Sequence, residues 1–245
     1  MSEDLDVRPR PQPSLGNRIL GVVGELSMTV GAVLLLFVAY LLWWTNVSAD
    51  RAANEAATEL QQQWSSSQPA PSPSADDEKE QAEPSRPELG SAFALAYIPR
   101  LRGSVWGLPV NHGVDMASLA RGLGHYPETA MPGEVGNFAV AGHRATNGEP
   151  LRDIDQLRVG DEVIIETATE FLVYTLDRDQ IVAPSDVWVI QPVPGQPGAT
   201  PTDRLITVTT CNPRWASYQR WVWWGTLSDR IDKSTGEVPS ALAAN

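Results

Sequence analysis

The stretch Leu205-Ile206-Thr207-Val208-Thr209-Thr210-Cys211 decides the fold, because this run rich in β-branched residues predicts a strand and ends in the only cysteine of the chain. The Asn212-Pro213 pair that follows breaks the strand and is expected to expose its last residue. A single cysteine can form neither an intrachain disulfide nor a cysteine-based zinc site. A free cysteine is most often a small buried apolar residue, but its position at a strand end favours a nucleophilic thiol.

Outward from this strand, the sequence around it is also β-like. A hairpin is predicted around residues 167–170, and short helices over residues 116–121 and 150–157. Short strands separated by Gly, Pro and Asp turns predict one mostly β domain, a barrel or a sandwich, over residues 91–235. The further predicted strands cover residues 93–98, 137–141, 162–166, 171–176, 186–190 and 220–227.

Two residues are candidate partners of the thiol. His143 follows a predicted strand and a glycine, and a nearby imidazole can take or give the proton of a thiol. Arg220 opens the strand after Cys211, and its guanidinium could stabilise a developing oxyanion. Each could instead be an ordinary structural residue, and Arg214 and Arg144 are rival arginines.

Residues close to the cysteine are candidates for substrate binding. Thr209 and Thr210 precede it, and Trp215 follows it, where it could form the wall of a groove for an apolar peptide residue. The proline- and glycine-rich segment 192–201 predicts a loop just before the cysteine strand, and this loop could be another wall.

An apolar segment near the N-terminus predicts a membrane anchor. Leu26–Trp44 is almost wholly apolar, and its length corresponds to roughly 28 Å of helix, close to the thickness of a bilayer core. We therefore expect one transmembrane helix over residues 19–44. Cleavage as a signal peptide near Val47-Ser48-Ala49 is the alternative, but the apolar run is longer than a signal sequence usually has. A buried core helix is a further alternative that the uniformly apolar surface disfavours.

The charges around this segment predict its orientation. Arg8, Arg10 and Arg18 precede it, so residues 1–18 are expected in the cytoplasm and the rest of the chain outside the cell membrane. Residues 45–90 are expected to be an extracytoplasmic helix followed by a flexible linker rich in Pro, Ser and acidic residues, and residues 236–245 a C-terminal tail. The net charge of −12 argues against nucleic acid as a partner.

These motifs together resemble the sortase family. Thr207–Cys211 is similar to the TLxTC strand of sortases, with Val208 where Leu is usual, and Asn137–Arg144 is similar to the segment that carries the family's histidine. Arg220 falls at the distance from the cysteine that is expected in class E sortases of actinobacteria. The resemblance covers roughly residues 91–230 and includes residues 96–101, 122–131 and 211–220.

The resemblance implies an eight-stranded sortase β-barrel with short helices and a cysteine transpeptidase of Gram-positive cell surfaces that needs no cofactor and no metal. Cys211 would attack the Thr–Gly bond of a C-terminal LAxTG- or LPxTG-type sorting signal, His143 would protonate the leaving amine, and Arg220 would stabilise the oxyanion. An amine of a lipid II-type cell-wall precursor would then release the secreted protein from the thioester.

Three alternatives remain open at this stage. A pilin-polymerising sortase often has a lid with a DP[F/W/Y] motif, and no such motif precedes Ser91. An L,D-transpeptidase carries a histidine and a glycine directly before its cysteine, where this chain has Thr209 and Thr210. A non-catalytic envelope scaffold with a decayed sortase domain is disfavoured by intact Cys211, His143 and Arg220.

Overall fold

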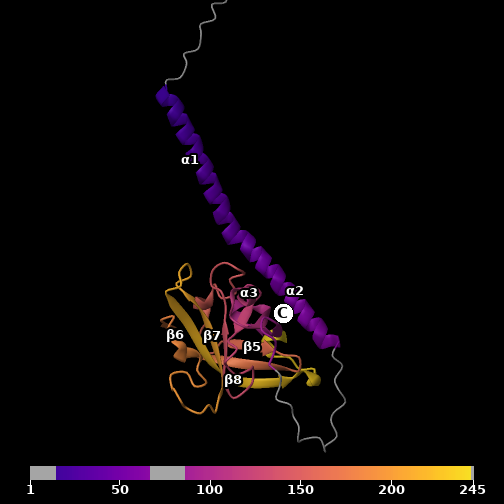
Figure 1. Cartoon of the computed structure of the whole chain (residues 1–245). Coiled ribbons are helices and arrows are strands. Elements are labelled where there is room, and N and C mark those ends of the chain that lie inside the picture. The colour runs from indigo at the N-terminus through magenta and orange to yellow at the C-terminus, as the bar shows by residue number, and fades with distance from the viewer. Residues whose placement is uncertain (1–14, 67–85, 244–245) are drawn as a thin grey trace, which may run out of the picture. The chain divides into compact units, whose positions relative to one another are not determined.

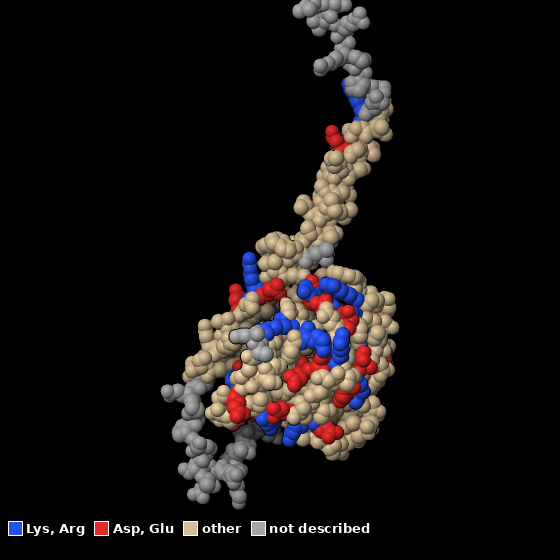
Figure 2. Space-filling view, turned by 180° about the vertical axis from the view of Figure 1, so that it is seen from behind, with Lys and Arg blue, Asp and Glu red and all other residues tan. Residues whose placement is uncertain are grey.

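The computed structural model describes residues 15–66 and 86–243, and the chain divides into two units, Met1–Trp44 and Thr45–Asn245. In the first unit, helix α1 (Leu15–Ala39) is followed by the π-helix η1 (Tyr40–Trp44). Arg18 and Glu25 are the only charged residues of α1, whose surface is nearly all uncharged in Figure 2. Residues Arg18–Ala39 are long and apolar enough to cross a membrane, as the composition predicted.

The second unit begins with helix α2 (Thr45–Ser66), which packs against strands β1 and β2. Its buried side chains are Ala49, Ala53 and Leu60, which lie on one face at helical spacing. The helix expected after the apolar segment therefore forms part of the same unit as the strands. The predicted linker falls mostly on residues 67–85, which lie outside the described residues, as do residues 1–14 of the expected cytoplasmic tail and residues 244–245 of the C-terminal tail.

Eight strands close into a barrel in the order β1-β2-β3-β4-β7-β8-β6-β5 (Figure 1), which confirms the predicted architecture. The β2–β3 and β4–β7 pairs are parallel, and the other pairs are antiparallel. The strands are β1 (Ala92–Tyr97), β2 (Trp106–His112), β3 (Leu123–His125), β4 (Gly136–Ala141), β5 (Glu162–Glu166), β6 (Glu170–Val182), β7 (Arg204–Asn212) and β8 (Gln219–Asp232).

The barrel interior is a closely packed apolar core. Phe138 of β4, Tyr174 of β6 and Ile206 of β7 are among its largest fully buried side chains, and Val208 of β7 is fully buried as well. Because side chains alternate along a strand, burial of Ile206 and Val208 directs the residues between and beyond them to the outer face of the barrel.

The segment Asp186–Ile190, which the sequence predicted to be a strand, is instead the 3-10 helix η4 (Val187–Ile190). Both edges of β7 are already paired, with β4 and with β8, so the barrel has no free edge there for this segment. It folds on itself and packs Trp188 against Trp224, with ring centroids 5.7 Å apart.

The remaining helices are short and lie between strands or at the end of the chain. Asp115 caps α3 (Met116–Leu119), because its carboxylate accepts hydrogen bonds from the backbone N–H groups of Ala117 and Ser118. The others are η2 (Pro99–Leu101), η3 (Ile154–Gln156), η5 (Lys233–Thr235) and α4 (Ser240–Ala243).

Candidate active site

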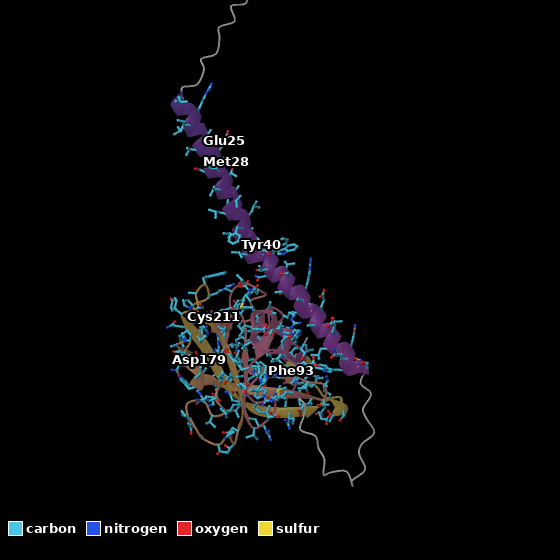
Figure 3. The ribbon with its side chains drawn as sticks, viewed as in Figure 1. Glu25, Met28, Tyr40, Phe93, Asp179 and Cys211 are labelled. Atoms are coloured by element: carbon cyan, nitrogen blue, oxygen red, sulfur yellow. The ribbon has the colours of Figure 1, made fainter. Side chains whose placement is uncertain are left out.

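Cys211 is the last but one residue of β7 and is half-buried near the end of the strand (Figure 3). It lies on the outer face together with Thr207 and Thr209, which alternate with the core residues of β7. The hydroxyls of these two threonines are already engaged, Thr207 donating to Asn137 Oδ1 at 2.7 Å and Thr209 lying 3.1 Å from the hydroxyl of Tyr126. Cys211, the candidate nucleophile, therefore lies at the end of a face whose two threonine hydroxyls are already engaged in hydrogen bonds.

Arg220 is the register partner of Cys211 in the antiparallel β7–β8 pair. Residues that lie directly opposite in such a pair point to the same face, with Cβ atoms about 4.5–5.5 Å apart. The Nη1 of Arg220 donates to the backbone carbonyls of Ser217, at 2.8 Å, and Gln219, at 2.9 Å. These bonds hold the guanidinium at the turn between the two strands.

His143 reaches the same place from strand β4, which runs parallel to β7. Ala141 pairs with Thr209, and the next residue continues the ladder because Gly142 N donates to Thr209 O at 3.1 Å. His143 and Cys211 each lie two residues beyond that registered pair, His143 just after the end of β4 and Cys211 next to the last residue of β7. The cysteine, the histidine and the arginine thus come from three adjacent strands at one end of the barrel.

Burial lowers the pKa of His143 below its ordinary value of 6.5. Its Nε2 atom is buried and has no hydrogen-bond partner within the residues that the structure describes. A neutral imidazole with an unengaged nitrogen suits a group that accepts a thiol proton and passes it on.

The residue before His143 is Gly142, and a residue without a side chain fits there because the space beside it is already filled. A Cβ atom at this position would lie 2.8 Å from Leu123 Cδ2 and 2.9 Å from Leu151 Cδ1. The carbonyl of Gly142 accepts a 2.7 Å hydrogen bond from the buried hydroxyl of Thr210, so the base of the histidine segment is fixed to β7. Thr210, one of the candidate substrate-binding residues, therefore turns its hydroxyl toward β4.

The other two substrate-binding candidates lie on the outside of the barrel. Thr209 shares the face of Cys211, but the hydroxyl is buried and also donates to Val140 O at 3.3 Å. Trp215 is 66% exposed in the loop after Cys211, with its ring 4.9 Å from the guanidinium carbon of Arg214.

The rival arginines have other partners. Arg144 is buried and donates to Asn212 Oδ1 at 2.6 Å and to Asp155 at 3.3 Å. Arg214 forms an ion pair with Glu149 at 2.5 Å. Of the three arginines, Arg220 is the one that β-sheet register places opposite Cys211.

A cavity of about 240 Å³ lies at the opposite end of the β4–β7 face. Asn137 near the start of β4 lines it, and so do Pro192 and Pro201 at the two ends of the loop that the sequence predicted to be a groove wall. The cavity and Cys211 are thus at the two ends of one outer face.

Sequence reasoning missed Tyr126, whose hydroxyl contacts Thr209, and Glu149, which pairs with Arg214. Neither stands in a motif next to a reactive residue. Only the contacts across the fold identify them.

A closed eight-stranded barrel with a cysteine, a histidine and an arginine on three neighbouring strand ends defines a class of cysteine transpeptidase. Residues 97–228 match the sortase domain, and the chain belongs to the sortase family. It is a class E sortase, as its relatives show. It is 40% identical over 230 residues to Sortase SrtE1 of Streptomyces coelicolor and 32% identical over 241 residues to Sortase SrtE2 of the same organism.

The coverage of these relatives differs. The SrtE1 match includes 91% of this chain and 60% of SrtE1, so this chain spans less than two thirds of that protein, whereas the SrtE2 match includes 94% of this chain and 90% of SrtE2. The crystal structure of Sortase E1 from Streptomyces coelicolor with a tripeptide in its active site is 39% identical, with a TM-score of 0.56 over 62% of this chain and 97% of that chain.

Proposed function

We propose that this chain is a membrane-anchored sortase that cleaves the Thr–Gly bond of an LAxTG- or LPxTG-type sorting signal and transfers the protein to an amine of a lipid II-type cell-wall precursor. The observation that carries the proposal is the pairing of Cys211 with Arg220 beside the strand end that bears His143. Membership of the sortase family supplies the reaction class. The tripeptide in the active site of the related sortase E1 supports a peptide as the substrate.

In the first half of the reaction, the Cys211 thiol gives its proton to neutral His143 while Sγ attacks the threonine carbonyl carbon. The carbonyl oxygen becomes an oxyanion, which the Arg220 guanidinium stabilises by charge-assisted hydrogen bonding. The C–N bond then breaks, and His143 gives the proton to the glycine amine that leaves. The product is a thioester between Cys211 and the threonine.

In the second half, the acceptor amine attacks the thioester carbonyl and His143 takes its proton. A second oxyanion forms at the same place, so Arg220 acts again. When the new amide forms, Sγ leaves and recovers the proton from His143. The low pKa of His143 suits both halves, because the imidazole must be neutral to accept a proton and must give it up readily.

The outer face of β4 and β7 leads from the cavity to Cys211 and could bind the sorting signal. Asn137, which lines the cavity, pairs with Leu205, and Cys211 lies six residues farther along β7, or roughly 20 Å at about 3.3 Å per residue. The four residues of the signal that precede the scissile bond span about 13 Å when extended. The first residue of the signal would therefore lie on this face between the cavity and Cys211 when its Thr–Gly bond lies at Cys211.

The apolar helix supports the membrane location. We propose that α1 anchors the enzyme as a single-pass protein, with the N-terminus in the cytoplasm and the barrel outside the cell membrane. Membrane-retained substrates and lipid-linked acceptors then share one surface with the enzyme, which raises their effective concentration.

The test is a mass-spectrometric transpeptidation assay with the full chain in detergent micelles. LAxTG and LPxTG peptides are each mixed with an amine acceptor and with wild type, Cys211→Ala, Arg220→Ala or Arg158→Ala. We expect the Thr–acceptor product from wild type and none from Cys211→Ala. Arg220→Ala should lower kcat by about 10²–10³-fold, the size expected for loss of an oxyanion donor.

Arg158→Ala is the matched control, because it removes an exposed arginine away from the site, and its kcat should equal that of wild type. A folded wild-type protein that transfers neither peptide would contradict the proposed activity. In that case the non-catalytic scaffold becomes the better interpretation.

A further inference from the structure

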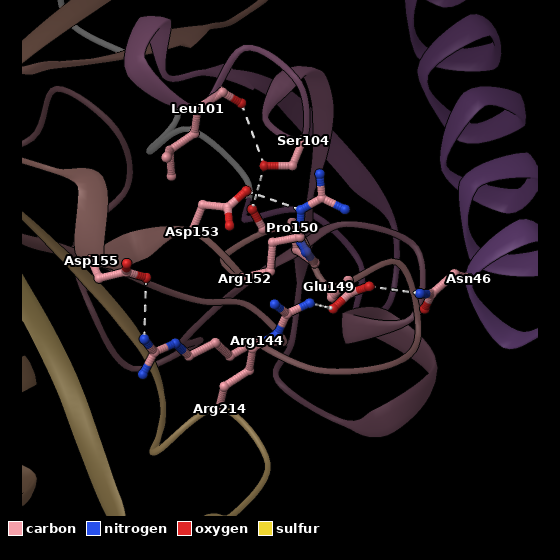
Figure 4. Close-up of polar contacts among 10 residues, drawn as sticks. All are labelled: Asn46, Leu101, Ser104, Arg144, Glu149, Pro150, Arg152, Asp153, Asp155 and Arg214. Atoms are coloured by element: carbon pink, nitrogen blue, oxygen red, sulfur yellow. Dashed lines mark hydrogen bonds and ion pairs between the residues drawn. The ribbon is translucent and has the colours of Figure 1, made fainter. Parts of the chain in front are cut away.

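Three segments that are far apart in the sequence meet at the carboxylate of Glu149 (Figure 4). Its Oε2 pairs with Arg214 at 2.5 Å, and its Oε1 accepts a 2.8 Å hydrogen bond from the amide of Asn46, which lies 103 residues earlier on α2. The Oδ1 of the same Asn46 amide accepts a 3.0 Å hydrogen bond from Gly148 N. One amide of α2 therefore binds two successive residues of the loop that follows His143.

The backbone of this loop is in an unfavourable conformation. Thr146, Asn147 and Glu149 have φ angles of 61°, 50° and 38°, in the left-handed region that residues other than glycine rarely adopt, and Gly148 between them has a φ of 81°. This conformation is energetically unfavourable for residues other than glycine, so the surrounding contacts must hold the loop in place. Asn46 and Arg214 provide contacts of this kind from outside the loop.

The loop and its partners are directly connected to the reactive residues. Leu151 N donates to His143 O at 3.0 Å, which closes the loop at its base, so His143 and Glu149 belong to one closed segment. Arg214 is three residues after Cys211, in the loop that joins β7 to β8. The Glu149–Arg214 ion pair thus ties the histidine segment to the cysteine segment.

The Glu149–Arg214 ion pair can fix the position of the histidine segment relative to the cysteine segment. The Glu149 side chain is 12% exposed, so the pair is screened less by water than an ordinary surface pair. The bond from Arg144 to Asn212 joins the same two segments at a second point, nearer to the barrel. Two links at different points fix the orientation of the histidine segment relative to the cysteine segment, whereas a single link would allow the segments to rotate about it.

We propose that Glu149 is a positioning residue of the transpeptidation site, which sets His143 against Cys211, and that Asn46 of α2 holds Glu149 for this role. The proposal rests on the proposed function. It also assigns a role in the reaction to α2, the helix that begins at the residue after the apolar segment.

The main test measures kcat and KM for peptide transfer by the full chain in detergent micelles. Glu149→Ala should lower kcat by about 10–100-fold and change KM less than threefold, because a displacement of about 1 Å of a reacting group can cost that much. Asn46→Asp should also lower kcat, since it places a second carboxylate against Glu149. Asp153→Ala is the matched control, because it removes the carboxylate of an exposed ion pair farther along the same segment and should leave kcat unchanged.

A double variant separates positioning from general loss of structure. Glu149→Gln alone removes the acceptor for either Asn46 or Arg214. Combined with Asn46→Asp, the new amide at position 149 can donate to the new carboxylate at position 46, while its oxygen accepts from Arg214. We expect kcat of the double variant to recover to within about threefold of wild type, above that of either single variant.

A second readout does not depend on the peptide substrate. Cys211 is the only cysteine, so the rate of alkylation by iodoacetamide as a function of pH reports on this thiol alone. In Glu149→Ala the profile should shift toward that of His143→Gln, while Asp153→Ala should match wild type. If wild type transfers no peptide, the proposed function fails and the alkylation profiles still decide this inference. Unchanged kcat and an unchanged alkylation profile in Glu149→Ala would overturn it.

Discussion

At the residue scale, the arrangement of the site depends on side-chain alternation and strand register. Ile206 and Val208 fill the barrel, so Cys211 must lie on the outer face, and antiparallel register then selects Arg220 as its neighbour. A slip of one residue in either strand would turn the thiol or the guanidinium toward the core. The proposed reactive pair is therefore placed by the same packing that stabilises the barrel.

Gly142 gives the first prediction at this scale. Gly142→Ala should lower the melting temperature, because the new Cβ would lie within 3.0 Å of Leu123 and Leu151. Overpacking of this kind costs about 1–3 kcal/mol, or roughly 2–4 °C for each kcal/mol in a chain of this size. Since His143 is the next residue, kcat should fall as well. Thermal denaturation and the peptide-transfer assay measure the two effects.

The control is Gly103→Ala. A Cβ at Gly103 meets no atom within 4 Å and its backbone is not left-handed, so stability and kcat should both remain at the wild-type level. Equal melting temperatures for Gly142→Ala and Gly103→Ala would show that the contacts around Gly142 can relax, and would contradict the prediction.

At the scale of elements, a buried histidine pair joins the parallel strands β2 and β3. His112 and His125 are register partners, and their Nδ1 atoms lie 3.1 Å apart. The Nε2 of His125 lies 3.0 Å from Ala130 O, which can only accept, so this nitrogen carries a proton. The Nδ1 of His125 is then the acceptor, and His112 donates to it. His125 is therefore neutral when the pair is formed.

This pair predicts a specific loss of stability in acid. Burial is the main cause that lowers the pKa of His125 to about 4 and that of His112 below 6.5, and the nearby Arg86 cation contributes in the same direction. Between pH 6.5 and about 4 the unfolded chain binds more protons than the folded protein, so the free energy of unfolding must fall as the pH is lowered. For His125 the fall amounts to roughly 3 kcal/mol. Denaturant unfolding at a series of pH values measures it.

His125→Gln is the variant that isolates this effect. It is expected to be less stable at pH 7, but its stability should depend less steeply on pH in the same interval. His143→Gln serves as a comparison, because it removes another histidine whose pKa is lowered. It should retain most of the dependence of the free energy of unfolding on pH. Parallel curves for wild type and His125→Gln would show that other groups cause the acid sensitivity.

Some of these elements could be predicted from the sequence, and others could not. Strands with clear apolar runs, such as Glu162–Glu166, were located to the residue. β2 was missed because Gly107 and Pro109 interrupt its pattern, and β3 because three residues are too few to form one. The η4 segment has the composition of a strand, and only the full pairing of β7 excludes it. Pairing of strands is a property of the whole barrel, which local sequence does not encode.

The candidate site could be named from the sequence to a similar extent. Cys211, His143 and Arg220 stand at strand ends, where sequence pattern and family resemblance make them candidates. The contact of Asn46 with Glu149 joins positions 103 residues apart, and neither residue has a motif. A polar side chain in a loop becomes informative only when its partner is known.

At the scale of the whole molecule, the chain combines an apolar helix with a charged catalytic unit. On the face of the barrel seen in Figure 2, basic side chains cross the middle of the face and acidic side chains lie around them. Six of the 30 acidic residues behind the net charge of −12 lie in the segment between α2 and β1.

The last prediction concerns the orientation in the membrane. In the Cys211→Ala background, Ser74→Cys and Ser2→Cys each give the chain one cysteine, on either side of α1 in the sequence. The charge bias predicts that a membrane-impermeant maleimide labels the Ser74→Cys protein in intact cells and labels Ser2→Cys only after lysis. Mass spectrometry of the purified protein measures both.

The two outcomes at position 2 also separate an anchor from a cleaved signal sequence. If cleavage occurred near Val47-Ser48-Ala49, the mature protein would lack residue 2 and would not be labelled even after lysis. Cleavage there would also remove Asn46 and with it the hydrogen bonds to Gly148 and Glu149. An anchored chain retains these bonds, so membrane retention and the geometry of the histidine loop should be lost together or kept together.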